Sequence, residues 1–378
     1  MAGSAFEFTD AHRVVLVNLA QAYDAWLEAA RRAAALDFVL QVKRQSYKEE
    51  AYEYLYRMTD AGKGLGNSLG RLTPELAALR ARHQQMKEAA LAEEKSRYER
   101  TLLECRQYRA LRLGTIASEA ARILRVMDVY GFTGNRYMVV GTNAMAVYEA
   151  EAGARFAADV EATEDFDMTW SAGKITLFAG VPPPSPWDPA ALLGLEPDDP
   201  LLPLLNQPPK SLRALLKLID ATYTKNSERP FQIRNAKGYE VEVLLAKKLV
   251  REFPREEELA PIPFEEQDWL LEGHQIVHAI SARDNTPARV IAPDPRWFGL
   301  QKLWLAEKPQ RNALKKPKDH RQGLLVLDAV RDYMPHYPLD AAFAAVLPGA
   351  LAPHFDAWER RPVAARAGGG GAAPERRW

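Results

Sequence analysis

Apolar residues in the first third of the chain recur at the spacing of a helix. Between Asp10 and Ala35 they return every three or four positions, which is typical of a helix with one buried face. The segment from Pro74 to Arg112 is rich in Ala, Leu, Glu, Lys, Arg and Gln and has no internal Pro or Gly, so its composition also favours a long helix. We expect the two helices to pack as a hairpin or a small bundle.

Short apolar runs replace this helical period in the middle of the chain. The run that begins at Tyr137 predicts a strand that ends at Gly141-Thr142-Asn143 and is followed by a helix. The segment from Phe231 to Leu245 predicts two strands around an Asn-Ala-Lys-Gly turn, which is the pattern of a β-hairpin. We therefore expect a β-sheet between helical regions.

Prolines mark the later connections. The Pro-rich segment from Val181 to Pro209 predicts a surface excursion, and a helical stretch follows from Ser211 to Tyr223. The segment from Val290 to Trp304 opens with a Pro-rich turn and passes into an amphipathic helix. Lys316 starts another helix, and Asp319 in its first turn suits the helix dipole.

Two carboxylates carry the first chemical signal. Residues 163–168 read Thr-Glu-Asp-Phe-Asp-Met, so Asp165 and Asp167 stand two positions apart on an expected strand and project from the same face. Two like charges held so close are costly unless a cation lies between them. The pair therefore suggests a divalent metal site.

The Gly-Thr turn upstream suggests a phosphate site. Gly141 lets the backbone approach a bulky anion, the Thr142 hydroxyl can donate a hydrogen bond, and the following helix directs its N-terminal amides at the same place. A phosphate cradle that faces a carboxylate pair is what magnesium-dependent phosphoryl or nucleotidyl transfer requires, because Mg²⁺ bridges carboxylates to substrate phosphates.

This order of strand, Gly-Thr turn, helix and Asp-apolar-Asp strand resembles the nucleotidyltransferase fold superfamily, which includes DNA polymerase beta-like enzymes and toxin-type minimal nucleotidyltransferases. Residues 139–149, Val-Val-Gly-Thr-Asn-Ala-Met-Ala-Val-Tyr-Glu, look closer still to a little-characterised bacterial group of nucleotidyltransferase-fold proteins. The resemblance covers roughly Ala121 to Tyr337. It implies transfer of a nucleoside monophosphate from an NTP such as ATP to a hydroxyl acceptor, with one or two Mg²⁺ ions as cofactor and release of pyrophosphate.

The resemblance also implies a third carboxylate on a later strand. Glu242 lies inside the second strand of the expected hairpin, where the family usually has Asp, and Glu240 on the same face is the rival candidate. In related enzymes this carboxylate helps to position a metal and can take the proton of the acceptor. Asp165 and Asp167 would hold Mg²⁺ together with Glu242.

The remaining residues would bind the nucleotide. Gly141, Thr142 and Asn143 would hold phosphate, and Lys302 and Lys318 would neutralise phosphate oxygens if their helices fold back over the strand ends. The acceptor, whether RNA, a protein or a small molecule, is left open by the sequence.

The sequence leaves simpler interpretations open. An Asp-x-Asp pair alone is usually solvated surface charge, and the two lysines can equally be solvated, or Lys302 can pair with a nearby acid. A different class of function is a catalytically inactive module that binds nucleotides or a partner, in a bacterial toxin or defence context. Glu at position 242 and the long N-terminal extension favour that alternative.

The segment between the first two helices has two interpretations. Residues 47–57 interleave aromatic and basic side chains that can stack on nucleotides, and the glycines of residues 62–71 with Lys63 and Arg71 can hold a phosphate. Equally, Tyr52, Leu55 and Tyr56 fit the packing face of a helix, and the glycines fit a mobile loop. The N-terminal helices are also a candidate surface for a protein partner.

Together these patterns predict an α+β protein. We expect a helical region at residues 1–115, a nucleotidyltransferase-like mixed β-sheet flanked by helices at 116–255, a mainly helical cap at 256–362 and a disordered tail at 363–378. The 50 basic and 50 acidic residues provide no bulk attraction for nucleic acid or membrane, so any RNA contact would be a local patch. One cysteine excludes an intramolecular disulfide, and the chain shows no signal segment or long apolar span, so a cytoplasmic location is the default.

Other chemistries have little support. His274 and His278 have helical ligand spacing, but no glutamate follows His274 in the pattern of a zinc protease. Cys105 lies in the long second helix, where a packing role is expected rather than a nucleophilic one. The sequence therefore favours the phosphate chemistry above.

Overall fold

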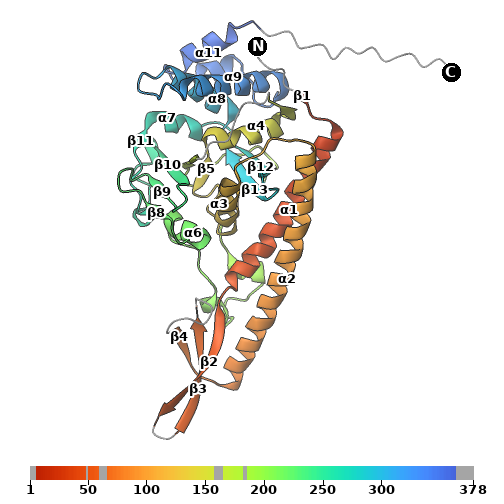
Figure 1. Cartoon of the computed structure of the whole chain (residues 1–378), viewed down its shortest axis with the longest axis vertical. Helices are drawn as coiled ribbons and strands as arrows, with labels where there is room; N and C mark the ends of the chain where they lie inside the picture. Colours follow the sequence, from red (N-terminus) through yellow and green to blue (C-terminus); the bar gives the residue numbers. More distant parts are fainter. Residues whose placement is uncertain (1–5, 48–49, 59–65, 157–164, 182–184, 363–378) are drawn as a thin grey trace, which may run out of the picture.

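The computed structural model describes residues 6–47, 50–58, 66–156, 165–181 and 185–362. The α+β fold expected from the sequence is confirmed: a body built on a mixed β-sheet carries a long two-helix arm at its side (Figure 1). Several sequence predictions fall outside the described residues, namely those for Glu164, Lys63, the prolines at 182–184 and the tail from 363. In the described part of the chain, no helix combines the length and the apolar character needed to cross a membrane.

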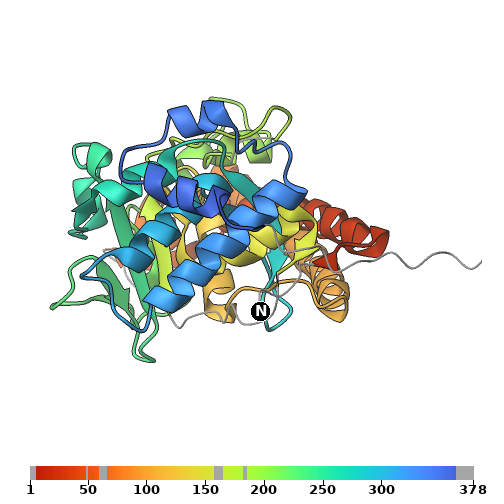
Figure 2. The same ribbon diagram turned by 90° about the horizontal axis from the view of Figure 1, so that it is seen from above.

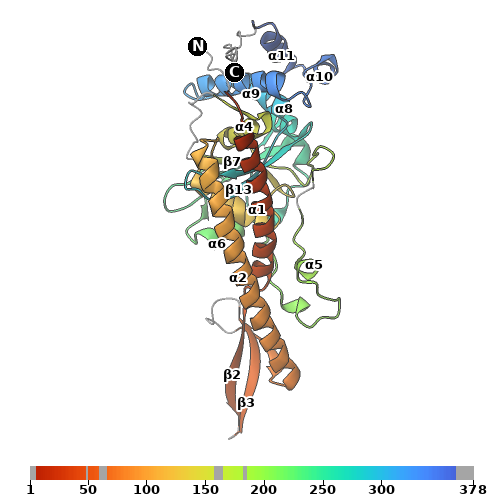
Figure 3. The ribbon, with the colours of Figure 1, turned by 90° about the vertical axis from the view of Figure 1, so that its right-hand side faces the viewer.

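The arm consists of two antiparallel helices, α1 (Asp10–Ala35) and α2 (Pro74–Ala110). Their pairing is visible in Figure 3, and side-chain contacts fix its direction. Near the middle of α1, Trp26 Nε1 donates to Glu94 Oε1 at 2.8 Å, whereas just after its end the Leu36 carbonyl lies 3.1 Å from His83 Nε2. Both predicted helices are therefore confirmed, α1 with the expected bounds and α2 ending two residues early.

A three-stranded antiparallel sheet occupies the far end of the arm, in the order β2 (Val39–Tyr47), β3 (Glu50–Met58), β4 (Asn67–Arg71). The helical interpretation of Tyr52, Leu55 and Tyr56 is wrong. In a strand, alternate residues face opposite sides, so Leu55 is fully buried while the two tyrosines lie on the other face and stay partly exposed. The Glu-Ala-Tyr-Glu-Tyr-Leu-Tyr sequence fits this period of two.

The expected surface excursion is wrong for the segment after α5 (Pro189–Leu193). Leu201, Leu204 and Leu205 are buried in a second core together with residues of α1, α2 and the β2–β4 sheet. Arg57 Nε donates to the Leu204 carbonyl at 2.7 Å, and Asn206 Nδ2 donates to the Ala34 carbonyl at 3.0 Å. The four leucines in the sequence Leu-Leu-Pro-Leu-Leu provide the apolar area that is buried here, although the prolines around them favour an exposed connection.

The central sheet has the strand order β5-β7-β10-β9-β8, and β11 pairs with the other end of β10. Strands β7 and β10 are parallel, whereas β5 and β9 run antiparallel to their neighbours, so the sheet is mixed. The predicted hairpin is confirmed as β9 and β10. The bounds are β5 (Tyr137–Val139), β7 (Asp165–Trp170), β8 (Thr224–Lys225), β9 (Gln232–Arg234), β10 (Glu240–Ala246) and β11 (Pro263–Phe264).

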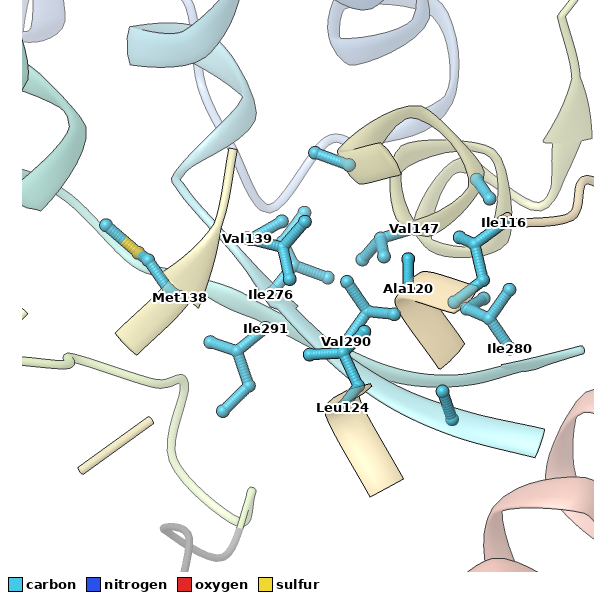
Figure 4. Packing of buried hydrophobic residues seen from close by; sticks show 14 of the residues in the cluster. Ile116, Ala120, Leu124, Met138, Val139, Val147, Ile276, Ile280, Val290 and Ile291 are labelled. Carbon is cyan, nitrogen blue, oxygen red and sulfur yellow. The ribbon is translucent and has the colours of Figure 1, made fainter. Parts of the chain in front are cut away.

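Helices flank this sheet and a second hairpin completes the core. The helices are α3 (Ser118–Val129), α4 (Met145–Ala152), α6 (Leu212–Ile219) and α7 (Glu265–Asp268), and the hairpin is β12 (Ile276–Ser281) with β13 (Pro287–Ala292). A pair of two-residue strands, β1 (Phe6–Glu7) and β6 (Ala154–Arg155), joins the start of the chain to the end of α4. Figure 4 shows apolar side chains of α3, α4, β5, β12 and β13 meeting in one cluster. The hairpin at 276–292 thus shares its core with the residues that precede it.

The C-terminal helices form a layer over the body, which Figure 2 shows from above. They are α8 (Pro295–Glu307), α9 (Lys316–Tyr333), α10 (Ala341–Ala345) and α11 (Ala352–Glu359). Gly299 and Gly323 lie where α8 and α9 cross, and a Cβ at position 323 would be 2.7 Å from the Gly299 carbonyl oxygen. Because neither residue has a side chain, the two helices approach closely and α9 lies against α4.

A buried cluster of charges joins the arm to the body. Asp128 of α3 is 1% exposed, accepts a hydrogen bond from the Tyr23 hydroxyl at 3.0 Å, and lies 3.5 Å from Arg289 of β13. Arg31 of α1 donates to the Asp128 carbonyl at 2.7 Å. Burial raises the pKa of Asp128, while the two guanidinium groups oppose that change. The charges compensate one another only when α1, α3 and β13 are packed together.

We predict that Asp128→Ala lowers the free energy of unfolding by about 3 kcal/mol, because it removes the one buried carboxylate beside the largely buried Arg289 charge. Asp24, which also pairs with Arg289 but whose side chain is 64% exposed, provides the control. We expect Asp24→Ala to cost less than about 1 kcal/mol in the same urea titration. Equal losses for the two variants would contradict the role given to the buried cluster.

Candidate functional site

The site begins where β5 meets the first residues of β7. Val140 N donates to the Asp167 carbonyl at 3.0 Å, which places Gly141 directly beside Asp167. Gly141 has φ +71°, and a Cβ at this position would lie 2.5 Å from Asp167 Oδ2. Glycine is therefore required both by the left-handed backbone and by the carboxylate that occupies the space of a side chain.

Glu242 lies next to Asp167 on the neighbouring strand. The parallel register of β7 and β10 pairs Glu242 with Asp167 and Glu240 with Asp165. Both glutamates therefore lie on the same face of the sheet as the two aspartates. Adjacent strands are about 4.8 Å apart, which brings the two side chains of each pair together. Asp167, Glu240 and Glu242 are all partly exposed. The structure therefore brings Asp167 and Glu242 to one place.

Asp165 is placed through its backbone alone. It opens β7 and its Cα pairs with that of Glu240. Its side chain lies outside the described residues, as do Thr163 and Glu164, which precede it. The register puts Asp165 two residue pairs away from Asp167 along the same two strands.

A buried amide on β9 contacts both glutamates. Gln232 is fully buried, and its Nε2 donates to Glu242 Oε1 and, at 3.3 Å, to Glu240 Oε2. Asn226 Nδ2 donates to Gln232 Oε1 at 2.9 Å and so fixes the orientation of the amide. Gln232 thus holds the two candidate third carboxylates in defined positions. No sequence signal points to this role of Gln232 beyond its place in a strand opposite Glu242.

Thr142 and Asn143 follow Gly141 in a single 3-10 turn (Gly141–Ala144) that leads into α4. Gln322 Nε2 of α9 donates to Thr142 Oγ1 at 3.3 Å. Because the hydroxyl oxygen is the acceptor, its own proton can be donated to a further acceptor such as a phosphate oxygen. Asn143 is 3% exposed, and its Oδ1 accepts from Ala117 N at 3.4 Å, which ties the turn to the start of α3.

Lys302 forms a buried ion pair. Its Nζ lies 2.8 Å from Asp319 Oδ1, and Arg311 donates to the other carboxylate oxygen at 2.7 Å. Burial alone would raise the pKa of Asp319, but Lys302 and Arg311 outweigh it and hold that pKa below its usual value. The sequence left open whether Lys302 meets phosphate or an acid, and here the ammonium group contacts Asp319. Its predicted contact with phosphate stays a prediction.

Lys318 lies in the first turn of α9, next to Asp319 in the sequence. Partial burial and repulsion from Lys302 lower the pKa of Lys318, while Asp319 and Asp167 act in the opposite direction. Asp167 thus lies within electrostatic range of Lys318 although the two residues are far apart in the sequence. The contact of Lys318 with phosphate stays a prediction.

The donor set suits a hard divalent cation. Within the described residues, no group of three or more His, Cys, Asp or Glu side chains is arranged to hold a metal ion. Mg²⁺, however, is commonly held by one or two carboxylates together with water and substrate phosphate, so the Asp167 and Glu242 oxygens fit its usual environment. The Gly141-Thr142 turn lies beside them.

The residues set aside at the sequence level have other partners. Cys105 is fully buried, and burial raises the pKa of its thiol to about 12, so the thiol is not a ready nucleophile. His278 lies on β12 rather than on a helix, and its Nε2 is 2.6 Å from Glu151 Oε2. His336 contacts the other oxygen of Glu151 at 2.7 Å.

Comparison with known proteins gives one match. A family model described as nucleotidyltransferase matches residues 118–186 and 199–348, which is more than half of the chain. The matched residues include Gly141, Asp167, Glu242 and the helices α8 and α9. Searches of curated proteins and of solved structures found no match.

We predict that Asp319→Asn lowers the free energy of unfolding by about 3 kcal/mol at neutral pH, because Lys302 then stays buried without a carboxylate. The lowered pKa fixes the sign: Asp319 stabilises the fold above its unfolded pKa of about 3.9, and this contribution is lost as pH falls through the folded pKa. Urea titrations should show a full difference between wild type and variant above about pH 5 and a shrinking one below about pH 4.

The matched control is Asp356→Asn, which removes an exposed carboxylate 3.8 Å from Arg360. It should change stability by less than about 0.5 kcal/mol at each pH. A pH-independent difference for Asp319→Asn would show that the ion pair with Lys302 is not its source.

Proposed function

Because this chain belongs to a family of nucleotidyltransferases, and so has a nucleotide as its expected substrate, we propose that it moves a nucleoside monophosphate from an NTP to a hydroxyl acceptor. In this reaction the acceptor oxygen forms a bond to the α-phosphorus, the bond from that phosphorus to the bridging oxygen breaks, and pyrophosphate leaves with the electron pair. The acceptor is RNA, a protein or a small molecule, which the labelling experiment below distinguishes.

The observation that carries the proposal is the juxtaposition of Gly141, Asp167 and Glu242. Two carboxylates on parallel neighbouring strands face a turn whose glycine leaves no side chain between them and an incoming phosphate. Holding two anions together in a half-buried place is costly, and a cation removes that cost. If these residues had only a structural role, replacing one carboxylate with a neutral residue would make the fold more stable.

Each residue then has a definite task. Asp165, Asp167 and Glu242 would hold Mg²⁺, which would neutralise part of the charge on the phosphates. The Gly141 and Thr142 turn binds phosphate oxygens, with the Thr142 hydroxyl as donor. Glu242, or Glu240 as its rival, positions the acceptor and takes the proton of its hydroxyl.

Lys318 is proposed to act on the leaving group. Its lowered pKa reflects partial burial beside Lys302, and a phosphate oxygen placed there would remove part of that repulsion. Lys302, which already contacts Asp319, supports the local positive potential and positions α8 against α9. Charge stabilisation of this kind is often a large part of enzymatic rate enhancement.

The inactive alternative also rests on a specific contact. Gln232 already donates a hydrogen bond to Glu242 Oε1, and position 242 carries the longer side chain where the family usually has Asp. A chain in which this contact persists when nucleotide binds would hold Mg-NTP and leave it unchanged. Release of pyrophosphate separates the two functions, since only an enzyme produces it.

We predict that Asp167→Ala reduces transfer by about a hundredfold or more while the protein remains folded, because the carboxylate contacts the reacting phosphates through the metal. The measurement is transfer of α-labelled ATP, GTP, CTP and UTP into a cell lysate with Mg²⁺, separated into protein, RNA and small-molecule fractions. Glu228→Ala, which removes an exposed acid on the loop before β9, is the control and should retain full transfer. Full activity of Asp167→Ala, with metal still required, would remove this carboxylate from the mechanism.

A second prediction distinguishes the two glutamates. Glu242→Gln should lose transfer by about a hundredfold, whereas Glu240→Gln, paired with Asp165 rather than Asp167, should lose about tenfold or less. The two variants remove the same charge from the same strand and face, and Gln232 contacts both residues, so nonspecific effects should be equal. Pyrophosphate release measured for both at several pH values provides the comparison, and the reverse order of losses would assign the role to Glu240.

A further inference from the structure

The β2–β4 sheet at the end of the arm has one face that no element of the described core covers. Strand alternation and the pairing register place a common set of side chains on it, which we call the tyrosine face: Gln41, Lys43, Gln45, Glu50, Tyr52, Tyr54, Tyr56, Ser68 and Arg71, with Val39 and Met58 at its inner end. The opposite face carries Leu40 and Leu55, which are buried against α2 and the Leu201–Leu205 segment. The sheet is thus anchored on one side and open on the other.

Aromatic rings and cations alternate on the tyrosine face. Lys43 Nζ lies 5.0 Å from the centroid of the Tyr56 ring, and the Arg71 guanidinium carbon lies 4.2 Å from that of Tyr52. Gln45 Nε2 donates to the Tyr56 hydroxyl at 2.7 Å, which fixes the ring in place. The three tyrosines are partly exposed. Ordered rings beside fixed cations form a ready stacking surface.

The charge on this face is positive although the whole chain is neutral. Among the described residues, the only acid that alternation puts on the tyrosine face is Glu50 at its outer end, where it accepts a hydrogen bond from the Tyr52 hydroxyl. Glu53 lies on the opposite face, paired in register with Arg44. The face therefore complements an anion that also offers flat apolar surfaces.

We propose that the tyrosine face binds single-stranded nucleic acid, with bases stacked on Tyr52, Tyr54 and Tyr56 and phosphates beside Lys43 and Arg71. Unpaired bases expose the rings that such a surface needs, whereas a duplex keeps its bases stacked on one another. A protein partner would need a more apolar patch than one of amides, hydroxyls and cations. This inference goes beyond nucleotidyl transfer and does not depend on it.

The position of the face makes the binding separable from catalysis. It lies at the far end of the arm from β5 and β7, and α2, with 37 residues, is about 55 Å long. Figure 3 shows the sheet projecting beyond the body along this helix. Binding there requires neither NTP nor Mg²⁺, so it can be measured without either, and its result is independent of whether transfer is found.

The test uses the full chain and a fluorescein-labelled 20-nucleotide oligouridylate, with fluorescence anisotropy as readout, in 50 mM salt and with a chelator present. We expect the double variant Lys43→Gln/Arg71→Gln to bind at least about tenfold more weakly and with a smaller dependence on salt. Tyr52→Ala/Tyr56→Ala should weaken binding to a similar extent, and Tyr52→Phe/Tyr56→Phe, which keeps the rings, should stay within about twofold of wild type.

Arg44→Gln is the matched control, because it removes one cation from the same strand but from the opposite face. It should change the affinity less than twofold, and thermal unfolding shows that each variant is folded. Wild type that does not bind at 50 μM, an equal loss for Arg44→Gln, or equal affinity for duplex RNA or heparin would overturn the proposal. So would self-association of the wild type that the Lys43→Gln/Arg71→Gln variant abolishes, since the face would then hold a second copy of the chain.

Discussion

The contact between the Gly141 backbone and the Asp167 carboxylate is the constraint on which the site depends. Val140, the residue after β5, donates its backbone N–H to the Asp167 carbonyl, so the chain must turn away from the sheet just where the carboxylate projects. Only a residue without Cβ can take φ +71° there without meeting Asp167 Oδ2. That turn starts the 3-10 segment, which leads directly into α4.

Contacts from two further elements, β10 and α9, hold Gly141, Thr142 and Asp167 in position. From β10, Glu242 lies in register with Asp167 and is fixed by the buried amide of Gln232. From above, α9 contributes Gln322 to the Thr142 hydroxyl and Lys318 to the electrostatic environment of Asp167. The close crossing of α8 and α9 at Gly299 and the ion pair of Lys302 with Asp319 fix that helix in turn. Positioning of the site thus depends on contacts between segments that are distant in the chain.

Those long-range contacts divide what the sequence could predict from what it could not. Local signals were sufficient for α1, α2, the β9–β10 hairpin and the strand that carries Asp167, because period and turn residues are properties of neighbours in the chain. The partner of Lys302 could not be predicted, because Asp319 is on another helix. The two side chains come into contact only through the way α8 and α9 cross. Gln232 and Gln322 gave no signal at all, because an amide acquires its role only from what it faces.

Two misreadings have physical causes of the same kind. The sequence around Tyr52 alternates aromatic and polar residues, which fits a strand, but its aromatic spacing also fits one face of a helix over so short a segment. The leucines at 201–205 stand among prolines that break regular structure, yet burial does not require regular structure, and these residues pack with α1, α2 and the β2–β4 sheet of the arm. The arm is therefore held by that segment and by the Asp128 cluster, rather than by its two helices alone.

The central claim is that Asp167 and Glu242 face a bound nucleotide through a shared metal ion. A crystal structure with a nonhydrolysable NTP and Mn²⁺ in place of Mg²⁺, recorded at the manganese absorption edge, tests it most directly. The account predicts an anomalous peak about 2.1 Å from an Asp167 oxygen, with the triphosphate on the Gly141-Thr142 turn. A nucleotide bound elsewhere, or manganese without Asp167 among its ligands, would contradict it.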